Sequence, residues 1–211
     1  MLLINFKNYI TGKKALKLAR KIQKYLPKAI VCLSDLEIET ISQQTDLKVY
    51  AQHVDYFKTD RATGFSTPEN IKQAGAVGSL LNHAEHRLMP ETIEKTVKRA
   101  KQAGLKIVLC TDSVKQARNF IKLYPDAIAF EDKKLIATKK SITQYKPNQI
   151  KKFVSLLKKT KILPLCGAGI HSAEDVASAY KLGCKGVLIA SAIANNKKPM
   201  GLLKELAKIK F

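Results

Sequence analysis

Three side chains with complementary chemistry each follow a short apolar run. Lys7 comes after LLINF, His83 after GSLLN and Glu131 after AIAF. A carboxylate and an imidazole can exchange protons with a substrate near neutral pH, and an ammonium group can hold an anion beside them. Taken singly, Glu131 could be a solvated loop acid, His83 a structural histidine and Lys7 a surface charge. The three would form a catalytic set only in a fold that brings them together.

Two loops of small residues add a second function to this set. Gly167, Ala168 and Gly169 follow one apolar run, and Ala190 and Ser191 follow the next. Small side chains leave backbone N–H groups unobstructed, and such groups can approach the oxygens of a phosphate. The pattern therefore predicts an anion-binding end close to the catalytic set, although the first loop could also be only a tight turn.

The elements that must position these residues alternate regularly along the chain. Eight short apolar runs predict strands at 2–6, 29–33, 48–52, 78–81, 105–110, 127–130, 162–165 and 186–189. Amphipathic stretches between and after them predict helices at 12–26, 35–44, 68–74, 90–103, 113–124, 147–158, 172–182 and 199–209. Several of these stretches open with Ser, Asp or Thr, or with Pro near the first turn, as helix starts do.

Strands that are apolar on both faces and alternate with helices indicate a parallel sheet covered by helices. Eight such units fit a closed (β/α)₈ TIM barrel, and we expect one domain over residues 1–211. An open doubly wound sheet is the alternative, but no GxGxxG follows the first strand or occurs elsewhere. The barrel predicts that all the polar residues named above meet at the carboxyl ends of the strands.

Composition narrows the classes of function. There are 38 Lys and Arg against 17 Asp and Glu, a formal charge of +21, but many of the lysines fill the polar faces of predicted helices. We therefore expect no nucleic-acid surface. Four cysteines are scattered without CxxC spacing, which indicates packed reduced thiols and no metal site. The apolar start is too short for a signal or a membrane span, so we expect a cytoplasmic protein without a membrane partner.

The motifs in order along the chain resemble those of triosephosphate isomerase in its short, archaeal form. They are NFK at 5–7, AQHVD at 51–55, LLNHAEHR at 80–87, IAFE at 128–131, LCGAGI at 165–170 and IAS at 189–191. The resemblance covers nearly the whole chain at matching spacing. It implies interconversion of glyceraldehyde 3-phosphate and dihydroxyacetone phosphate in glycolysis and gluconeogenesis, with no cofactor and no metal.

The resemblance also implies a role for each residue. Glu131 would be the carbon-acid base and His83, as a neutral imidazole, the electrophile that polarises the carbonyl. Lys7 would supply positive charge, and Glu85 would hold it in place or act only as a first-turn helix acid. The substrate contacts would come from Asn5, Phe6, Lys7, the loop residues Ile136 and Ala137, and the backbone N–H groups of Gly167, Gly169, Ala190 and Ser191.

The segment DKKLIATKK after Glu131 departs from the family pattern of two prolines, an acid and LIGTG. Leu135 and Ile136 are kept, but both glycines and both prolines are replaced. Ala84 stands where a serine is common. Because a closing lid excludes water and retains the enediolate, we predict an active isomerase with lower turnover or a weaker hold on phosphate.

Two other functions and one assembly are consistent with the sequence. The chain could be another barrel enzyme for a phosphorylated substrate, or a non-catalytic relative that binds polyanions. The segment HVDYFKTDRATGF at 53–65 resembles the one with which family members dock into a neighbouring subunit. It predicts a homodimer or a homotetramer.

Overall fold

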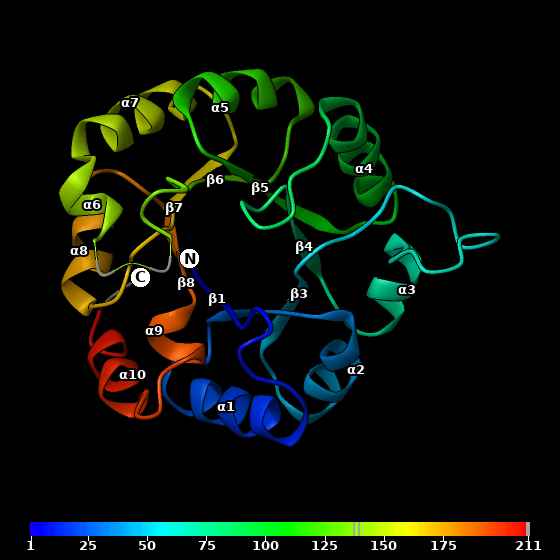
Figure 1. Cartoon of the computed structure of the whole chain (residues 1–211), viewed down its shortest axis with the longest axis horizontal. Coiled ribbons are helices and arrows are strands. Elements are labelled where there is room, and N and C mark those ends of the chain that lie inside the picture. Colours follow the sequence, from blue (N-terminus) through cyan, green and yellow to red (C-terminus); the bar gives the residue numbers. More distant parts are fainter. Residues whose placement is uncertain (137, 139, 210–211) are drawn as a thin grey trace.

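Eight parallel strands close into one barrel in the computed structural model, which describes residues 1–136, 138 and 140–209 (Figure 1). Each strand pairs with its sequence neighbours, and β1 closes the barrel against β8. The predicted fold is thus confirmed. The strands are β1 Leu2–Asn5, β2 Ile30–Leu33, β3 Lys48–Ala51, β4 Gly78–Leu81, β5 Lys106–Thr111, β6 Ala127–Phe130, β7 Leu163–Cys166 and β8 Gly186–Ile189.

The strands are buried on both faces, which explains why their sequences are continuously apolar. Alternate residues such as Leu3, Val108 and Leu165 point into the barrel and pack together there. Their neighbours, such as Ile4 and Ile107, face the surrounding helices and join a larger core. Each fully buried aliphatic side chain contributes about 1.5–3 kcal/mol relative to exposure. The two layers together hold the loops at the strand ends in fixed positions.

Helices surround the barrel in chain order (Figure 1). They are α1 Gly12–Tyr25, α2 Asp35–Gln44, α3 Pro68–Gln73, α4 Pro90–Gln102, α5 Val114–Phe120, α6 Ile142–Tyr145, α7 Pro147–Leu157, α8 Ala173–Lys181, α9 Ser191–Ala194 and α10 Met200–Leu206. The short α6 and α9 were not predicted. The predicted helix 113–124 ends its α-helical part at Phe120, continues as a 3₁₀ turn and stops at Tyr124, whose φ is 50°.

Capping groups set several helix starts. Ser172 and Asp175 form a capping box at α8, in which each side chain accepts a hydrogen bond from the other's backbone N–H. Pro68, Pro90 and Pro147 occupy the first turns of their helices, where a missing N–H costs nothing. These local signals place the loop before each helix, and hence the residues that follow each strand.

All four cysteines are buried and free, as predicted. Within the described residues, no cluster of three or more His, Cys, Asp or Glu side chains is arranged to hold a metal ion. No helix in the same part of the chain has the length and apolar character needed to span a membrane.

Candidate active site

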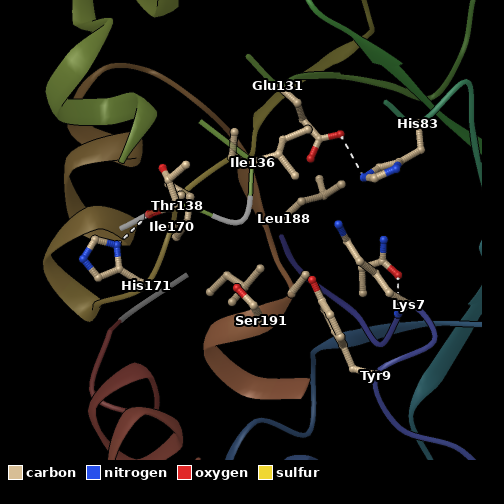
Figure 2. A pocket seen from close by; sticks show the side chains of 15 residues that line it. Lys7, Tyr9, His83, Glu131, Ile136, Thr138, Ile170, His171, Leu188 and Ser191 are labelled. Atoms are coloured by element: carbon tan, nitrogen blue, oxygen red, sulfur yellow. Dashed lines mark hydrogen bonds and ion pairs between the residues drawn. The ribbon is translucent and has the colours of Figure 1, made fainter. Parts of the chain in front are cut away.

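A pocket lies at the carboxyl ends of the strands, where the barrel topology predicted it (Figure 2). Asn5 and Lys7 reach it from β1, His83 from β4 and Glu131 from β6. The side opposite these polar groups is formed by small residues after β7 and β8, among them Ser191. The fold therefore brings together residues separated by more than a hundred positions in the sequence.

The backbone is strained at three of the turns that build this mouth. Lys7, Asn82 and Ala168 follow β1, β4 and β7, and their φ values are 47°, 58° and 72°. Non-glycine residues with positive φ are uncommon and cluster at functional sites, because each costs about 1–3 kcal/mol that the surrounding structure must offset. Asn82 shows how the offset is made, since its side chain donates to Cys110 O and accepts from Leu88 N.

Glu131 is buried, with 5% of its surface exposed, and its Oε2 has no hydrogen-bond partner among the described residues. Gly167 provides the space for it: a Cβ at position 167 would lie 2.6 Å from Glu131 Oε1. Burial, together with the charge of Glu131, raises the pKa of the Cys110 thiol well above its usual value. The thiol therefore stays protonated beside the carboxylate and adds no second negative charge to the site.

His83 faces Glu131 across the pocket, with Nε2 lying 3.7 Å from Glu131 Oε2 (Figure 2). The other ring nitrogen, Nδ1, accepts a hydrogen bond from the backbone N–H of Glu85 at 3.2 Å. Because a backbone amide can only donate, Nδ1 carries no proton, and in the neutral ring the proton lies on Nε2. The ring thus presents an N–H donor to the pocket.

Lys7 is held by its neighbours on both sides. Its Nζ lies 2.5 Å from Glu85 Oε1, and its backbone N–H donates to Asn5 Oδ1 at 2.9 Å. The side chain of Lys7 is 10% exposed, whereas that of Glu85 is 56% exposed. Glu85 does not line the pocket and contacts it only through Lys7 and His83, so the expected pairing of Lys7 with Glu85 is present.

Unpaired backbone donors line the opposite side of the pocket. Among the described residues, no backbone or side-chain group accepts a hydrogen bond from the N–H of Gly169, Ala190 or Ser191. The N–H of Gly167 is different, because it donates to Phe130 O at 3.0 Å and continues the pairing of β6 with β7. The expectation that Gly167 offers its N–H to a phosphate is therefore corrected: it is a spacer beneath Glu131.

The remaining predicted contacts fall in three places. Ile136 lines the pocket and lies over it beside Glu131 and Leu188 (Figure 2). Phe6 does not, since it is 1% exposed and packs in the core between strands and helices. Ala137 lies outside the described residues.

The loop after Glu131 is fastened at its start by Asp132. Asp132 Oδ1 accepts from Lys134 N at 2.8 Å, and Oδ2 forms an ion pair with Lys146, just before α7. Burial acts to raise the pKa of Asp132, but hydrogen bonds from Lys146 and from the Lys134 backbone outweigh it and hold that pKa below its usual value. Asp132 occupies the position of the first proline in the family pattern. Its two side-chain contacts restrain the loop here, as the ring of a proline would.

The far end of the same loop contacts the loop of small residues. Gly169 has a φ of 70°, and a Cβ there would lie 2.0 Å from Lys140 O. Ile142 N also donates to Ala168 O at 3.1 Å. With Ile136 and Thr138 over the pocket, the remaining cavity is only about 40 Å³. A cavity of this size holds only a few water molecules, so any larger ligand requires the loop to move.

Sequence reasoning missed several residues that line the pocket. They are Tyr9, Thr138, Ile170, His171 and Leu188. Leu188 occupies an inward-facing position of β8, which the alternation of inward and outward side chains along that strand could have indicated. The exposed His171 ring binds Gly169 O at 2.6 Å and lies 3.1 Å from Asp175, and no sequence signal distinguishes it.

This combination defines a (β/α)₈ barrel enzyme whose acid–base pair faces a set of unpaired backbone donors. Residues 1–208 match the family model for triosephosphate isomerase. The triosephosphate isomerase of Saccharolobus solfataricus is 39% identical over 97% of this chain and 93% of its own. Those of Pyrobaculum calidifontis and Sulfolobus acidocaldarius are 38% and 37% identical, over 99% of this chain and 95% and 94% of theirs. The chain belongs to the triosephosphate isomerase family and is an isomerase.

Proposed function

We propose that the chain interconverts glyceraldehyde 3-phosphate and dihydroxyacetone phosphate through an enediolate, with Glu131 as the base. The observation that carries the proposal is the buried pair of Glu131 Oε2 and His83 Nε2, 3.7 Å apart. A substrate between them would present a C–H bond to the carboxylate and a carbonyl oxygen to the imidazole. No cofactor takes part, because the hydrogen moves as a proton between adjacent carbons.

Glu131 suits this step because no described residue donates a hydrogen bond to its Oε2. Its carboxylate removes the proton from the carbon next to the carbonyl, and the same group returns the proton to the neighbouring carbon. A group that shuttles a proton between two adjacent atoms must reach both, which the position of Glu131 above the strand mouth supports.

His83 and Lys7 stabilise the charge that develops on the substrate oxygens. The Nε2–H of the neutral His83 ring donates to the oxygen that becomes negative. The ammonium group of Lys7, held by Glu85, adds positive charge, and the side-chain amide N–H of Asn5 is available because its oxygen is engaged by Lys7 N. Preorganised donors of this kind cost no reorganisation when charge appears.

The phosphate would accept hydrogen bonds from the N–H groups of Gly169, Ala190 and Ser191. These donors carry no side chain longer than a hydroxymethyl group, so phosphate oxygens can approach the backbone. Leu135 and Ile136 would close over the substrate as the loop returns, and exclusion of water would then protect the enediolate.

An assay that follows both triose phosphates tests this mechanism. The wild type should isomerise the substrate far above Glu131→Gln, which keeps the size of the side chain but removes the base. His83→Ala and Lys7→Ala should each lose most of the activity, about 10²-fold or more for a preorganised donor. No isomerisation above the Glu131→Gln background would end the enzymatic proposal, and full activity in either other variant would overturn that residue's role.

We also propose a homodimer or homotetramer that uses the segment at 53–65. Figure 1 shows this segment projecting beyond the ring of helices between β3 and α3. Its rings pack on each other, with centroids 4.4 Å apart for Tyr56 and Phe57 and 4.0 Å for Phe57 and Phe65, and Phe65 stays 46% exposed. An exposed aromatic cluster of this kind favours burial in a partner.

A neighbouring cavity suggests where a partner's segment would dock. The cavity has a volume of about 550 Å³ and shares Lys7 and His83 with the active-site pocket. A segment that filled it would shield the Lys7 and Glu85 pair from water. Light scattering after size exclusion tests this assembly: Phe65→Glu should give monomers with reduced activity, whereas the control Tyr124→Ser on the opposite end should not. A monomeric wild type would refute it.

We place the enzyme in the cytoplasm, where its reaction would serve glycolysis and gluconeogenesis. Cell fractionation with an antibody to the chain tests the location, and recovery in the membrane fraction would contradict it.

A further inference from the structure

A second cavity opens at the amino ends of the strands, on the opposite end of the barrel from the active site. It has a volume of about 790 Å³ and shares no residue with the active-site pocket. Its walls include Tyr50, Lys106, Val108, Ala127 and Leu163, all of which belong to β3, β5, β6 and β7. We call it the floor cavity. Its size is in the range that holds small organic ligands.

Tyr50 turns its hydroxyl-bearing end toward this cavity. The side chain belongs to the inward-facing layer of the barrel, and its ring lies across Gly78, the first residue of β4. A Cβ at position 78 would lie 2.6 Å from Tyr50 Cζ, so only glycine leaves room for the ring in this orientation. The phenol oxygen is therefore carried to the amino end of the strands.

The Tyr50 hydroxyl has no hydrogen-bond partner among the described residues, and its oxygen is not one of their buried unpaired atoms. The residue as a whole is only 3% exposed, so the hydroxyl is the part of it that meets the open cavity. Burial and the charge of Asp126 raise the pKa of Tyr50 above its usual value, which keeps the hydroxyl protonated and able to donate. A phenol hydroxyl that faces a cavity is a donor that a ligand can use in place of solvent.

The charges around the floor cavity are mostly positive. Four lysines line it: Lys101, Lys106, Lys159 and Lys161. The acid among its lining residues is Asp126, and its Oδ2 already accepts from Ile107 N at 2.9 Å. Lysine heads around a low-dielectric wall attract anions and repel cations. The apolar walls, including the partly exposed Leu163, favour a ligand with an apolar body.

We propose that the floor cavity binds a planar organic anion, such as an aromatic carboxylate, sulfonate or phosphate. Its ring packs against Val108 and Leu163, one acceptor atom takes the hydrogen bond of Tyr50, and Lys106 faces its charge. Because the two sites lie at opposite ends of the strands, this ligand does not compete with a substrate at the carboxyl ends.

Anilinonaphthalene sulfonate is a suitable probe because it is a planar aromatic anion whose fluorescence rises in an apolar site. Titration of the full chain should show saturable binding at one site, and dihydroxyacetone phosphate should not displace the probe. Tyr50→Phe keeps the ring and removes only the donor, so it should weaken binding about tenfold, as expected for loss of a hydrogen bond to a charged group. Lys106→Met should weaken it several-fold.

Two matched controls separate this site from general attraction to a basic surface. Tyr25→Phe and Lys181→Met make the same chemical changes on other elements and should leave binding unchanged. Tyr50→Phe removes a hydroxyl that bonds to no described residue, so without probe its melting temperature should stay close to that of the wild type, which shows that the variant folds.

Three results would overturn the proposal. The first is binding that Tyr50→Phe and Lys106→Met leave intact. The second is displacement of the probe by dihydroxyacetone phosphate, which would place it in the active-site pocket. The third is absence of saturation, or an equal loss in Lys181→Met, either of which would mean that the probe binds the lysine-rich surface without a site.

Discussion

Replacing Asp132 by alanine removes both contacts that fasten the start of the lid, the loop at 132–140. One is the hydrogen bond that Asp132 Oδ1 accepts from Lys134 N, and the other is the ion pair with Lys146. Neither contact is part of the chemistry itself. The substitution therefore tests whether the lid must be held closed for the enzyme to work at full rate.

The free energy that the closed lid loses in Asp132→Ala can be worked out from how exposed the two contacts of Asp132 are. The backbone hydrogen bond of a nearly buried acceptor contributes about 1 kcal/mol. The ion pair contributes less than a buried one, because the Lys146 side chain is 42% exposed and solvent screens it, so about 0.2–1 kcal/mol is appropriate. The closed state should thus lose about 1–2 kcal/mol, which shifts the closing equilibrium by about 5- to 30-fold. Asp132→Asn keeps the first contact and should cost only a few-fold.

Steady-state kinetics measures the consequence. The value of kcat/KM for glyceraldehyde 3-phosphate should fall by up to about tenfold in Asp132→Ala, with more inorganic phosphate released from enediolate that escapes. Lys146→Met should give a smaller loss, and the double variant should show coupling between the two positions. Lys133→Ala changes an exposed neighbour in the same loop and is the control. If Asp132→Ala matches Lys133→Ala in rate and phosphate release, the fastening has no role in catalysis.

Three further predictions follow from single contacts. Thr96 is fully buried in α4, and its hydroxyl has no partner in the described part of the chain. Thr96→Val should therefore stabilise the fold by about 1 kcal/mol, and differential scanning calorimetry should show a melting temperature about 2–4 °C higher. Gly169→Ala would force a Cβ against Lys140 O at a φ of 70°, so it should raise KM in the steady-state assay by displacing the end of the lid; an unchanged KM would contradict this. Folding lowers the pKa of Asp132 below its usual value of 3.8. The ionised side chain therefore contributes its full stability above pH 3.8, and this contribution is lost as the pH falls through the lower pKa of the folded state. The difference in melting temperature between the wild type and Asp132→Ala should vanish in that acid range.

The barrel could be predicted because every strand is apolar on both faces. All eight predicted strands are present, and their ends differ from prediction by one residue at most. These small differences arise because pairing with the neighbouring strand decides where a strand ends. For example, β7 was predicted at 162–165 but covers Leu163–Cys166, the residues that pair with β6. The predicted helix 113–124 changes to a 3₁₀ turn after Phe120, and Tyr124 ends that turn in a left-handed conformation; hydrophobic periodicity registers neither change.

The site was predicted less completely than the fold. Lys7, His83 and Glu131 follow strands directly, so the position of each strand determines where they lie. The pairing of Asp132 with Lys146 depends on the path of the lid and on where α7 begins, and neither leaves a pattern in the sequence. Gly167 was expected to be small so that its N–H could reach a phosphate. Its lack of a side chain instead makes room for Glu131.

The lysines of the lid are compatible with closure because the loop separates its two kinds of side chain. Leu135 is buried and Ile136 lines the pocket, whereas Lys133 and Lys134 remain exposed. Closing therefore leaves the ammonium groups of these two lysines in water, and their removal from it would be costly. The formal charge of the whole chain, +21, is opposite to that of a phosphorylated substrate, and a field of this sign speeds encounter at low salt. A faster encounter can offset part of a slower closure in kcat/KM, and this contribution should shrink as ionic strength rises.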